Sequence, residues 1–252
     1  MAMAEMDSEQ RATWEAIYDK KNEEFLKNPP VGKDLLRWKY QRYVKEYCRT
    51  IRSVDEQVGR LLDYLEEKGV LDNTVIVYTS DQGFLLGEHG LYDKRFMYEE
   101  SFRTPLIISC PSLVKKHSVC KELVQNIDLA PTFLSLAGVE VPKEMSGRSL
   151  LPLFKNGKAE NWRNELYYHF YDYPAVGSVR KHDGIRTKRY KLIHWYGEGS
   201  GNDEAIDFWE LYDLKKDVME VNNVYDNPKY VKVREALTVQ LEKLRKDVGV
   251  TE

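Results

Sequence analysis

Long apolar runs are absent from this sequence. No hydrophobic stretch among its 252 residues approaches the roughly 18 residues that span a membrane, so no membrane-spanning segment is expected. Cysteine is scarce as well, with only Cys48, Cys110 and Cys120. These three form no C-x-x-C pair and their number is odd, which argues against a disulfide framework or a zinc site. A single Cys110–Cys120 disulfide is not excluded by this argument.

An excess of one charge sign is also missing. The formal net charge is -3, so no basic field points to nucleic acid as a partner. The first ten residues, M-A-M-A-E-M-D-S-E-Q, are acidic and polar and do not form a signal peptide. We therefore expect either a cytosolic protein or a sequence whose natural amino terminus lies further upstream.

The composition fits a globular protein, with 42% hydrophobic and 31% charged residues, in one large domain or two modest ones. A break at residues 28–32 precedes a long helical pattern, whose apolar residues recur at spacings of three and four up to Leu65. Gly69 stands where a helix cap is expected. The β-branched run Thr74–Thr79 then predicts a buried strand of a parallel sheet. Helix, turn and buried strand together indicate an α/β layer.

The rest of the chain predicts a change of character near Val141. Before it, a second strand is expected over 105–109 and a short helix over 128–138. After it come, in chain order, a strand over 165–173, a hairpin over 184–196 that turns near Lys188, a strand over 208–214 and a helix opened by Asn227-Pro228. We therefore predict a first domain over 1–140 and a small antiparallel α+β subdomain over 141–252.

Two oxygen-bearing side chains follow the first predicted strand. Asp81 and Gln82 stand where ligands collect in open α/β sheets, outside the carboxyl end of a strand. Carboxylate and amide oxygens suit calcium or magnesium better than a soft metal. Calcium takes about six to eight oxygens, so the other ligands must come from elsewhere.

Two cationic side chains follow twelve residues later. A lysine such as Lys94, close to a divalent ion, can neutralise charge that develops on a transferred oxyanion. Arg95 adds a planar fork of donors that suits sulfate or carboxylate. Taken singly, each residue has a plainer interpretation: Asp81 as a turn cap, His89 as a structural histidine and Lys94 as a solvated surface lysine.

Taken together, these residues are specific. The pattern S-D-Q-G-x3-G-E-H-G-x3-K-x3-Y-E-E-S-x-R-T-P-L resembles the second half of the type I sulfatases of the alkaline-phosphatase superfamily. The D-K-R and W-E-L-Y-D features are most similar to bacterial sulfatases acting on glycans, including N-acetylglucosamine-6-sulfatases. The resemblance covers roughly residues 38–245, through the further stretches 47–65, 126–132, 147–152, 186–192 and 210–214.

The resemblance implies a fold and a set of roles. The fold is α/β, part of an alkaline-phosphatase-like mixed or parallel sheet with flanking helices, followed by the small C-terminal subdomain. Asp81 and Gln82 would hold calcium. Lys94 would bind the sulfate and stabilise the leaving oxygen, with His89 near the substrate or supporting the loop. The sugar contacts implied are Asp93, Arg95 and His182.

One departure from the family pattern is large. A type I sulfatase needs C-x-P-S-R or its serine variant, whose first residue becomes formylglycine, the nucleophile. Here Cys48 begins C-R-T-I-R, Cys110 begins C-P-S-L-V and Cys120 begins C-K-E-L-V. The family's early Asp-Asp metal pair and its upstream Lys and His are missing too. We therefore expect a C-terminal half that is inactive alone, from an enzyme that is periplasmic or secreted when intact.

Two alternatives remain. The chain could be a non-catalytic remnant that binds a sulfated glycan or a protein partner, with a homo-oligomer formed through an exposed sheet edge. It could also belong to a phosphatase or phosphonate hydrolase of the same superfamily. In the leading hypothesis the expected partner is a sulfated carbohydrate substrate.

Overall fold

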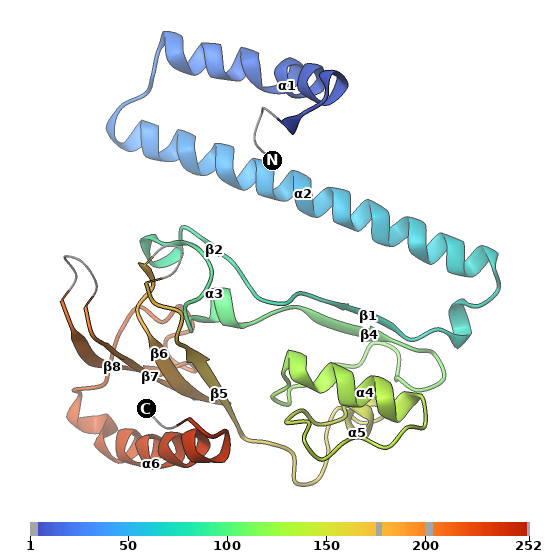
Figure 1. Cartoon of the computed structure of the whole chain (residues 1–252), viewed down its shortest axis with the longest axis vertical. Helices are drawn as coiled ribbons and strands as arrows, with labels where there is room; N and C mark the ends of the chain where they lie inside the picture. Colours follow the sequence, from blue (N-terminus) through green and yellow to red (C-terminus); the bar gives the residue numbers. More distant parts are fainter. Residues whose placement is uncertain (1–4, 175–177, 200–203, 251–252) are drawn as a thin grey trace. The chain divides into compact units, whose positions relative to one another are not determined.

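The computed structural model describes residues 5–174, 178–199 and 204–250 (Figure 1). The chain divides into two compact units, Met1–Glu67 and Lys68–Glu252. The boundary predicted near residue 140 stays a prediction. Among the described residues, no helix has both the length and the apolar character needed to cross a membrane. All three cysteines are free, so the Cys110–Cys120 bridge does not form in this structure.

The first unit contains two helices, α1 (Ser8–Lys27) and α2 (Gly32–Glu67). Asp7 caps α1, because its carboxylate accepts the backbone N–H of Gln10 at 2.8 Å. The predicted break at residues 28–32 separates the helices. They contact each other through stacked Phe25 and Trp38 rings, 4.1 Å apart. Past the end of α2, Gly69 adopts φ +66°, as its predicted capping role requires.

The first strands of the second unit form an antiparallel pair. β1 (Ile76–Thr79) pairs with β4 (Leu106–Ser109), after the 3₁₀ turn Leu71–Asn73. Both strands lie where the sequence predicts them. The prediction that the strand over Thr74–Thr79 is buried and parallel to its neighbour is wrong. Tyr78 is 39% exposed, and Thr79 is exposed as well. A β-branched run favours a strand without fixing its partner's direction, which depends on the path of the connection between the two strands.

The connection between β1 and β4 carries the short strands β2 (Leu85–Leu86) and β3 (Tyr92–Asp93), the 3₁₀ turn Glu88–Gly90 and helix α3 (Glu99–Phe102). After β4 come, in chain order, the 3₁₀ turn Asn126–Asp128, α4 (Leu129–Leu136) and α5 (Leu151–Phe154). The helix predicted over 128–138 is confirmed. It ends before Gly138, whose φ is +71°.

Asp128 gives a structural reason for two of the stretches that resemble the sulfatase pattern. Its carboxylate is fully buried and accepts the N–H of Gln125 and of Arg148, both at 2.8 Å. Arg163 adds two guanidinium contacts, at 2.5 and 2.7 Å. Burying a carboxylate is tolerable only when its oxygens are paired in this way. Asp128 therefore ties residues 126–132 to residues 147–152.

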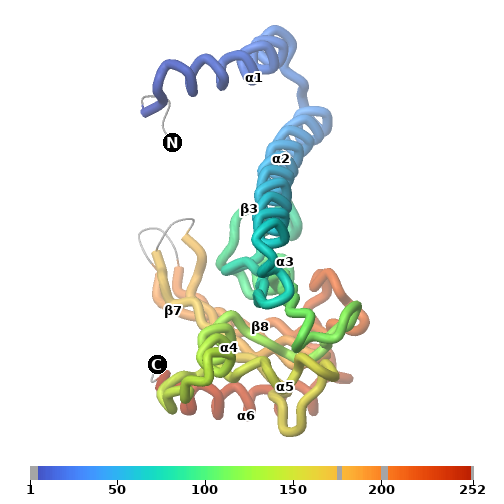
Figure 2. The backbone as a smooth tube through the Cα atoms, turned by 90° about the vertical axis from the view of Figure 1, so that its right-hand side faces the viewer, coloured from blue at the N-terminus to red at the C-terminus, as the bar shows by residue number. Residues whose placement is uncertain are grey.

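The C-terminal part is a four-stranded antiparallel sheet with one long helix. Its strand order is β5-β6-β7-β8, and β6 pairs with β7 across the hairpin predicted near Lys188. The elements are β5 (Glu165–Phe170), β6 (His182–Thr187), β7 (Tyr190–Gly197), β8 (Ile206–Asp213), the 3₁₀ turn Pro228–Tyr230 and α6 (Val231–Asp247). Figures 1 and 2 show α6 along one face of this sheet. The predicted α/β class with an antiparallel C-terminal subdomain is confirmed.

The two faces of the sheet bury different partners. On one face Ile185, Leu192 and Leu211 pack against Leu237 and Leu241 of α6. On the other face Ile193, Trp195 and Tyr212 pack against Met97, from the connection between β1 and β4. Residues 96–102 are therefore held on the C-terminal sheet, and this contact positions the loop that precedes them.

Candidate functional site

Asp81 and Gln82 lie in the turn that follows β1. The Ser80 hydroxyl donates to the Gln82 carbonyl at 2.7 Å and fixes the turn. Asp81 is exposed and Gln82 is half-buried. Both line a groove that also takes in Arg95 and continues over residues of β4 and β5. The two predicted metal ligands thus share one open groove with one predicted substrate contact.

Gly83 holds this turn against α3. Its N–H donates to the Ser101 carbonyl at 2.8 Å. A Cβ at this position would lie 2.1 Å from the Glu100 carbonyl oxygen, which is far inside a van der Waals contact. Only glycine fits such a close approach of two backbones. The turn that presents Asp81 is therefore fixed to α3 directly.

The loop over residues 87–95 contains strained backbone. His89, Asp93 and Arg95 are not glycine, yet their φ angles are 55°, 84° and 91°. Non-glycine residues in this region cost on the order of 1–3 kcal/mol each, and they concentrate at functional sites. The strain lies at three of the residues that the sequence analysis selected, which supports a functional role for the loop.

The two cations of this loop differ in their pairing. The Arg95 guanidinium forms a close ion pair with Asp93, two residues earlier. Within the described ranges, the half-buried Lys94 has no hydrogen bond or ion pair. The Lys94 ammonium is therefore available for an anionic ligand. The charge of the Arg95 guanidinium is partly neutralised by Asp93.

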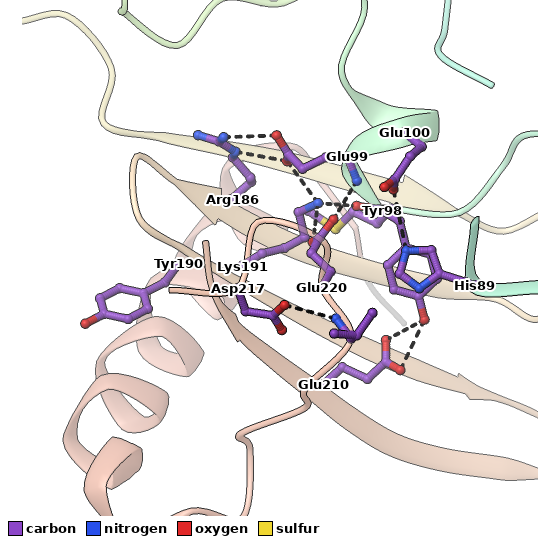
Figure 3. A network of polar contacts seen from close by, with 12 residues as sticks. His89, Tyr98, Glu99, Glu100, Arg186, Tyr190, Lys191, Glu210, Asp217 and Glu220 are labelled. Atoms are coloured by element: carbon purple, nitrogen blue, oxygen red, sulfur yellow. Dashed lines mark hydrogen bonds and ion pairs between the residues drawn. The ribbon is translucent and has the colours of Figure 1, made fainter. Parts of the chain in front are cut away.

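His89 lies against α3. Its ring stacks on Tyr98 with centroids 4.3 Å apart, and its Nε2 is 3.5 Å from Glu100 Oε2 (Figure 3). Tyr98 in turn donates to Glu210 of β8 at 3.2 Å. Burial and the Glu210 carboxylate raise the pKa of Tyr98 far above its usual value. His89 thus connects the loop to the C-terminal sheet, and of its two implied roles the geometry favours loop support.

His182 lies inside the protein. It is 0% exposed and stacks on Trp195 with centroids 4.2 Å apart, with the rings of Tyr168 and Phe170 also close. Its Nδ1 lies 2.8 Å from the Arg180 carbonyl oxygen, and no described group hydrogen-bonds its Nε2. A sugar contact by His182 stays a prediction, and in this structure such a contact requires the ring to become accessible.

Burial of His182 gives the fold a pH dependence. It lowers the pKa of His182 to about 4, from 6.5. The unfolded chain therefore binds more protons between these values, so stability should fall as the pH drops from 6.5 to 4. We expect a loss of roughly 3 kcal/mol from this group, which His182→Phe should remove. Urea unfolding at pH 7 and pH 4 measures it. Equal pH dependence in both proteins would contradict the expectation.

The predicted metal ligands fit part of a calcium site. Among the described residues, no three His, Cys, Asp or Glu side chains are placed to hold a metal ion. Asp81 and Gln82 bring two hard oxygen donors to the groove, and the only hydrogen bond described for the Asp81 carboxylate is a long one, 3.4 Å from Ser80 Oγ. This donor set suits calcium in kind but supplies fewer oxygens than the six to eight that calcium takes.

Sequence reasoning missed the residues that hold the loop. Ser101 is 5% exposed, and its hydroxyl accepts the Arg95 N–H at 3.1 Å. Tyr168 donates to the Arg95 carbonyl at 2.9 Å, and burial raises its pKa to about 12. Lys191 is fully buried beneath α3. A usable signal existed only for Lys191, a charged residue inside the otherwise apolar run Tyr190–Ile193.

Comparisons with known proteins show the family of the chain. The family described as Sulfatase matches residues 5–139, and the family described as N-sulphoglucosamine sulphohydrolase, C-terminal, matches residues 87–247. An N-acetylglucosamine-6-O-sulfatase of Bacteroides thetaiotaomicron is 49% identical over 243 residues, covering 96% of this chain and 42% of that protein. The chain therefore spans less than half the length of this relative.

Solved structures are also similar to this chain. A protein in complex with its substrate D-glucosamine-2-N,6-O-disulfate superposes with a TM-score of 0.89 at 49% identity, over 97% of this chain and 48% of the other. A phosphonate monoester hydrolase of Agrobacterium radiobacter superposes with a TM-score of 0.65 at 26% identity, over 78% of this chain and 40% of the other.

Proposed function

The chain belongs to the sulfatase family, and from that premise we propose that it forms one wall of the active site of a sulfuric ester hydrolase acting on sulfated carbohydrate. One observation carries the proposal: Asp81, Gln82 and Arg95 line a single groove. Lys94, next to Arg95, has no partner among the described residues. Oxygen donors for a metal ion and a free cation suit an ester whose transferred group is an oxyanion such as sulfate.

Each residue has a proposed role. Asp81 and Gln82 donate two of the oxygens around a calcium ion, which would supply Lewis-acid stabilisation when bound. Lys94 contacts the sulfate and opposes the charge that develops on the leaving oxygen. Arg95 and Asp93 contact the sugar as a pair, and His89 keeps the loop against α3. His182 is proposed as a sugar contact only where its ring becomes accessible.

The nucleophile is proposed to lie outside these 252 residues, which contain no C-x-P-S-R sequence. The family resemblance implies formylglycine there. Alone, the chain is therefore expected to be inactive and to hold calcium weakly. The proposed substrate is a 6-O-sulfated glucosamine, because one relative described above is named for such a sugar and one solved structure holds such a sugar as its substrate. A periplasmic or secreted location for the whole enzyme is proposed on the same resemblance.

A chimera tests this function. The matched 42% of the Bacteroides thetaiotaomicron enzyme is replaced by this chain, which 49% identity makes practicable. We expect the chimera to release sulfate from glucosamine 6-sulfate, measured by ion chromatography, while the chain alone releases none. A folded chimera without turnover would refute the proposal, and so would clear turnover by the chain alone. Cleavage of a phosphonate monoester faster than of glucosamine 6-sulfate would instead favour the phosphonate hydrolase alternative. The similarity to the Agrobacterium radiobacter structure is the reason to include this substrate.

A further inference from the structure

A fully buried lysine lies beneath the loop. Lys191 of β7 is 0% exposed, and three oxygens surround its ammonium (Figure 3). They are the Met97 carbonyl at 2.6 Å, Glu220 Oε1 at 2.7 Å and Glu99 Oε1 at 3.0 Å. An ammonium has three donors, and burying it costs several kcal/mol unless they are satisfied. The Met97 contact is a hydrogen bond, and the two carboxylate oxygens lie within ion-pair distance of the ammonium.

Two of these oxygens belong to residues that directly follow the loop, Met97 and Glu99. Glu99 is enclosed further, because its N–H donates to Glu220 Oε2 at 2.6 Å and its carboxylate pairs with Arg186 at 3.1 Å. Burial alone would raise the pKa of Glu99, but Lys191 and Arg186 lower it below its usual value. Two cations and two carboxylates thus hold the start of α3 on the sheet.

The same short helix holds both halves of the candidate site. The Ser101 carbonyl accepts the N–H of Gly83, next to Gln82. The Ser101 hydroxyl accepts the N–H of Arg95, next to Lys94. A displacement of α3 would therefore move the proposed metal ligands and the proposed sulfate contacts together.

The packing around Met97 makes the placement specific. Gly184 of β6 leaves room for Met97, because a Cβ there would lie 2.6 Å from the Met97 sulfur. Met97 is itself 0% exposed, in the cluster with Ile193 and Trp195. Apolar packing fixes this side chain, while Lys191 fixes the backbone carbonyl of the same residue.

We propose that Lys191 is a positioning residue for the candidate site. It sets the distance of α3 from the sheet and, through Ser101, the separation of Asp81–Gln82 from Lys94–Arg95. The catalytic consequence rests on the proposed function, but the positioning itself can be measured without substrate. The rival explanation is that Lys191 only stabilises the sheet. The two differ in which backbone amides lose protection when the ammonium is removed.

Hydrogen exchange on the full chain separates them. The N–H of Arg103, at the end of α3, donates to the Glu99 carbonyl at 2.8 Å. In Lys191→Met we expect the amides of Gly83, Arg95 and Arg103 to exchange about tenfold faster or more, the effect of losing a charge-assisted hydrogen bond. The amides of Leu192 and Ile193, in the sheet itself, should change less than about threefold. Equal acceleration of both groups, or no acceleration at the first three amides, would overturn the proposal.

Arg245→Met is the matched control. Arg245 pairs with Asp183 of β6 at 2.6 Å from the α6 side, so its loss removes a part-buried ion pair of the same sheet without touching α3. It should leave the amides of Gly83 and Arg95 unchanged. Acceleration at those two amides in this variant would show general loosening of the sheet and would also overturn the proposal.

A milder variant covers the case in which Lys191→Met does not fold. Glu220→Gln keeps the shape of the side chain and removes one charge next to Lys191, so the same exchange pattern should appear with a smaller amplitude. In the chimera, Lys191→Met should lower kcat/KM about tenfold. If the parent chimera has no activity, the proposed function fails while the exchange result still decides the role of Lys191.

Discussion

Asp81→Ala in the chimera is expected to lower kcat/KM for glucosamine 6-sulfate about a thousandfold. The side chain is proposed to contribute one anionic oxygen to the calcium site. It is exposed in the groove, and the one hydrogen bond described for its carboxylate is a long one from Ser80. Lewis-acid stabilisation by a bound metal is worth several kcal/mol, and about 4 kcal/mol corresponds to a thousandfold in rate. Because Asp81 makes no buried contact, the variant should keep the melting temperature of the parent.

Two comparisons make the Asp81 result specific. Asp72→Ala changes an exposed carboxylate of the preceding 3₁₀ turn and should leave activity within about twofold, since surface changes of this kind rarely matter. A calcium titration gives the second comparison, because a lost ligand should shift half-activation to higher calcium. Full activity of Asp81→Ala in low calcium would exclude Asp81 as a ligand.

Lys94→Met is expected to lower kcat in the chimera about a hundredfold or more. Its ammonium is the loop cation that lacks a partner within the part of the chain that the structure describes, and it is proposed to contact the transferred sulfate. Removing one preorganised group that stabilises developing charge typically costs about 100–1,000-fold in kcat. A change confined to KM would show instead that Lys94 only helps the substrate to bind.

Charge and position are separated by two further variants. Lys143→Met removes an exposed lysine outside the groove and should have no effect on kcat. Lys94→Arg keeps the charge but replaces a point charge with a planar fork, so partial activity is expected. Full activity of Lys94→Met, with the fold unchanged by circular dichroism, would remove Lys94 from the proposed mechanism.

Most elements of the fold were predictable because their signals are local. The end of α2 follows from Gly69 and the end of α4 from Gly138, both of which adopt positive φ. The hairpin near Lys188 follows from two strand patterns separated by a turn, and β6 indeed pairs with β7 there. The direction of β1 relative to β4 was not predictable in this way, because it depends on the path of the long connection between them.

The candidate site was predictable in its residues more than in its geometry. The spacing of Asp81, Gln82 and Arg95 came from one continuous pattern, and the structure places all three on one groove. His182 could not be placed from its sequence neighbours, because burial depends on which face of β6 it occupies. That face is fixed by its pairing opposite Trp195, which local sequence does not reveal.

The sequence marks Lys191 as a charged residue inside an apolar run, but it does not reveal what the side chain contacts. Lysine is almost never fully buried without a partner, and a lysine in a strand is normally assigned to the solvent face. Its partner Met97 is 94 residues earlier in the chain. Only the three-dimensional contact of the sheet with the segment before α3 shows why a cation is tolerated there.

Strand β7 contacts two different partners through alternate residues of a single run. Leu192 faces α6, whereas Lys191 and Ile193 face the segment that carries the candidate site. Neighbouring positions therefore meet different structural requirements, because one set holds the helix and the other holds the segment before and within α3. Alternate residues of β7 on the α6 face could therefore be substituted to raise stability without changing the residues that face the segment before α3.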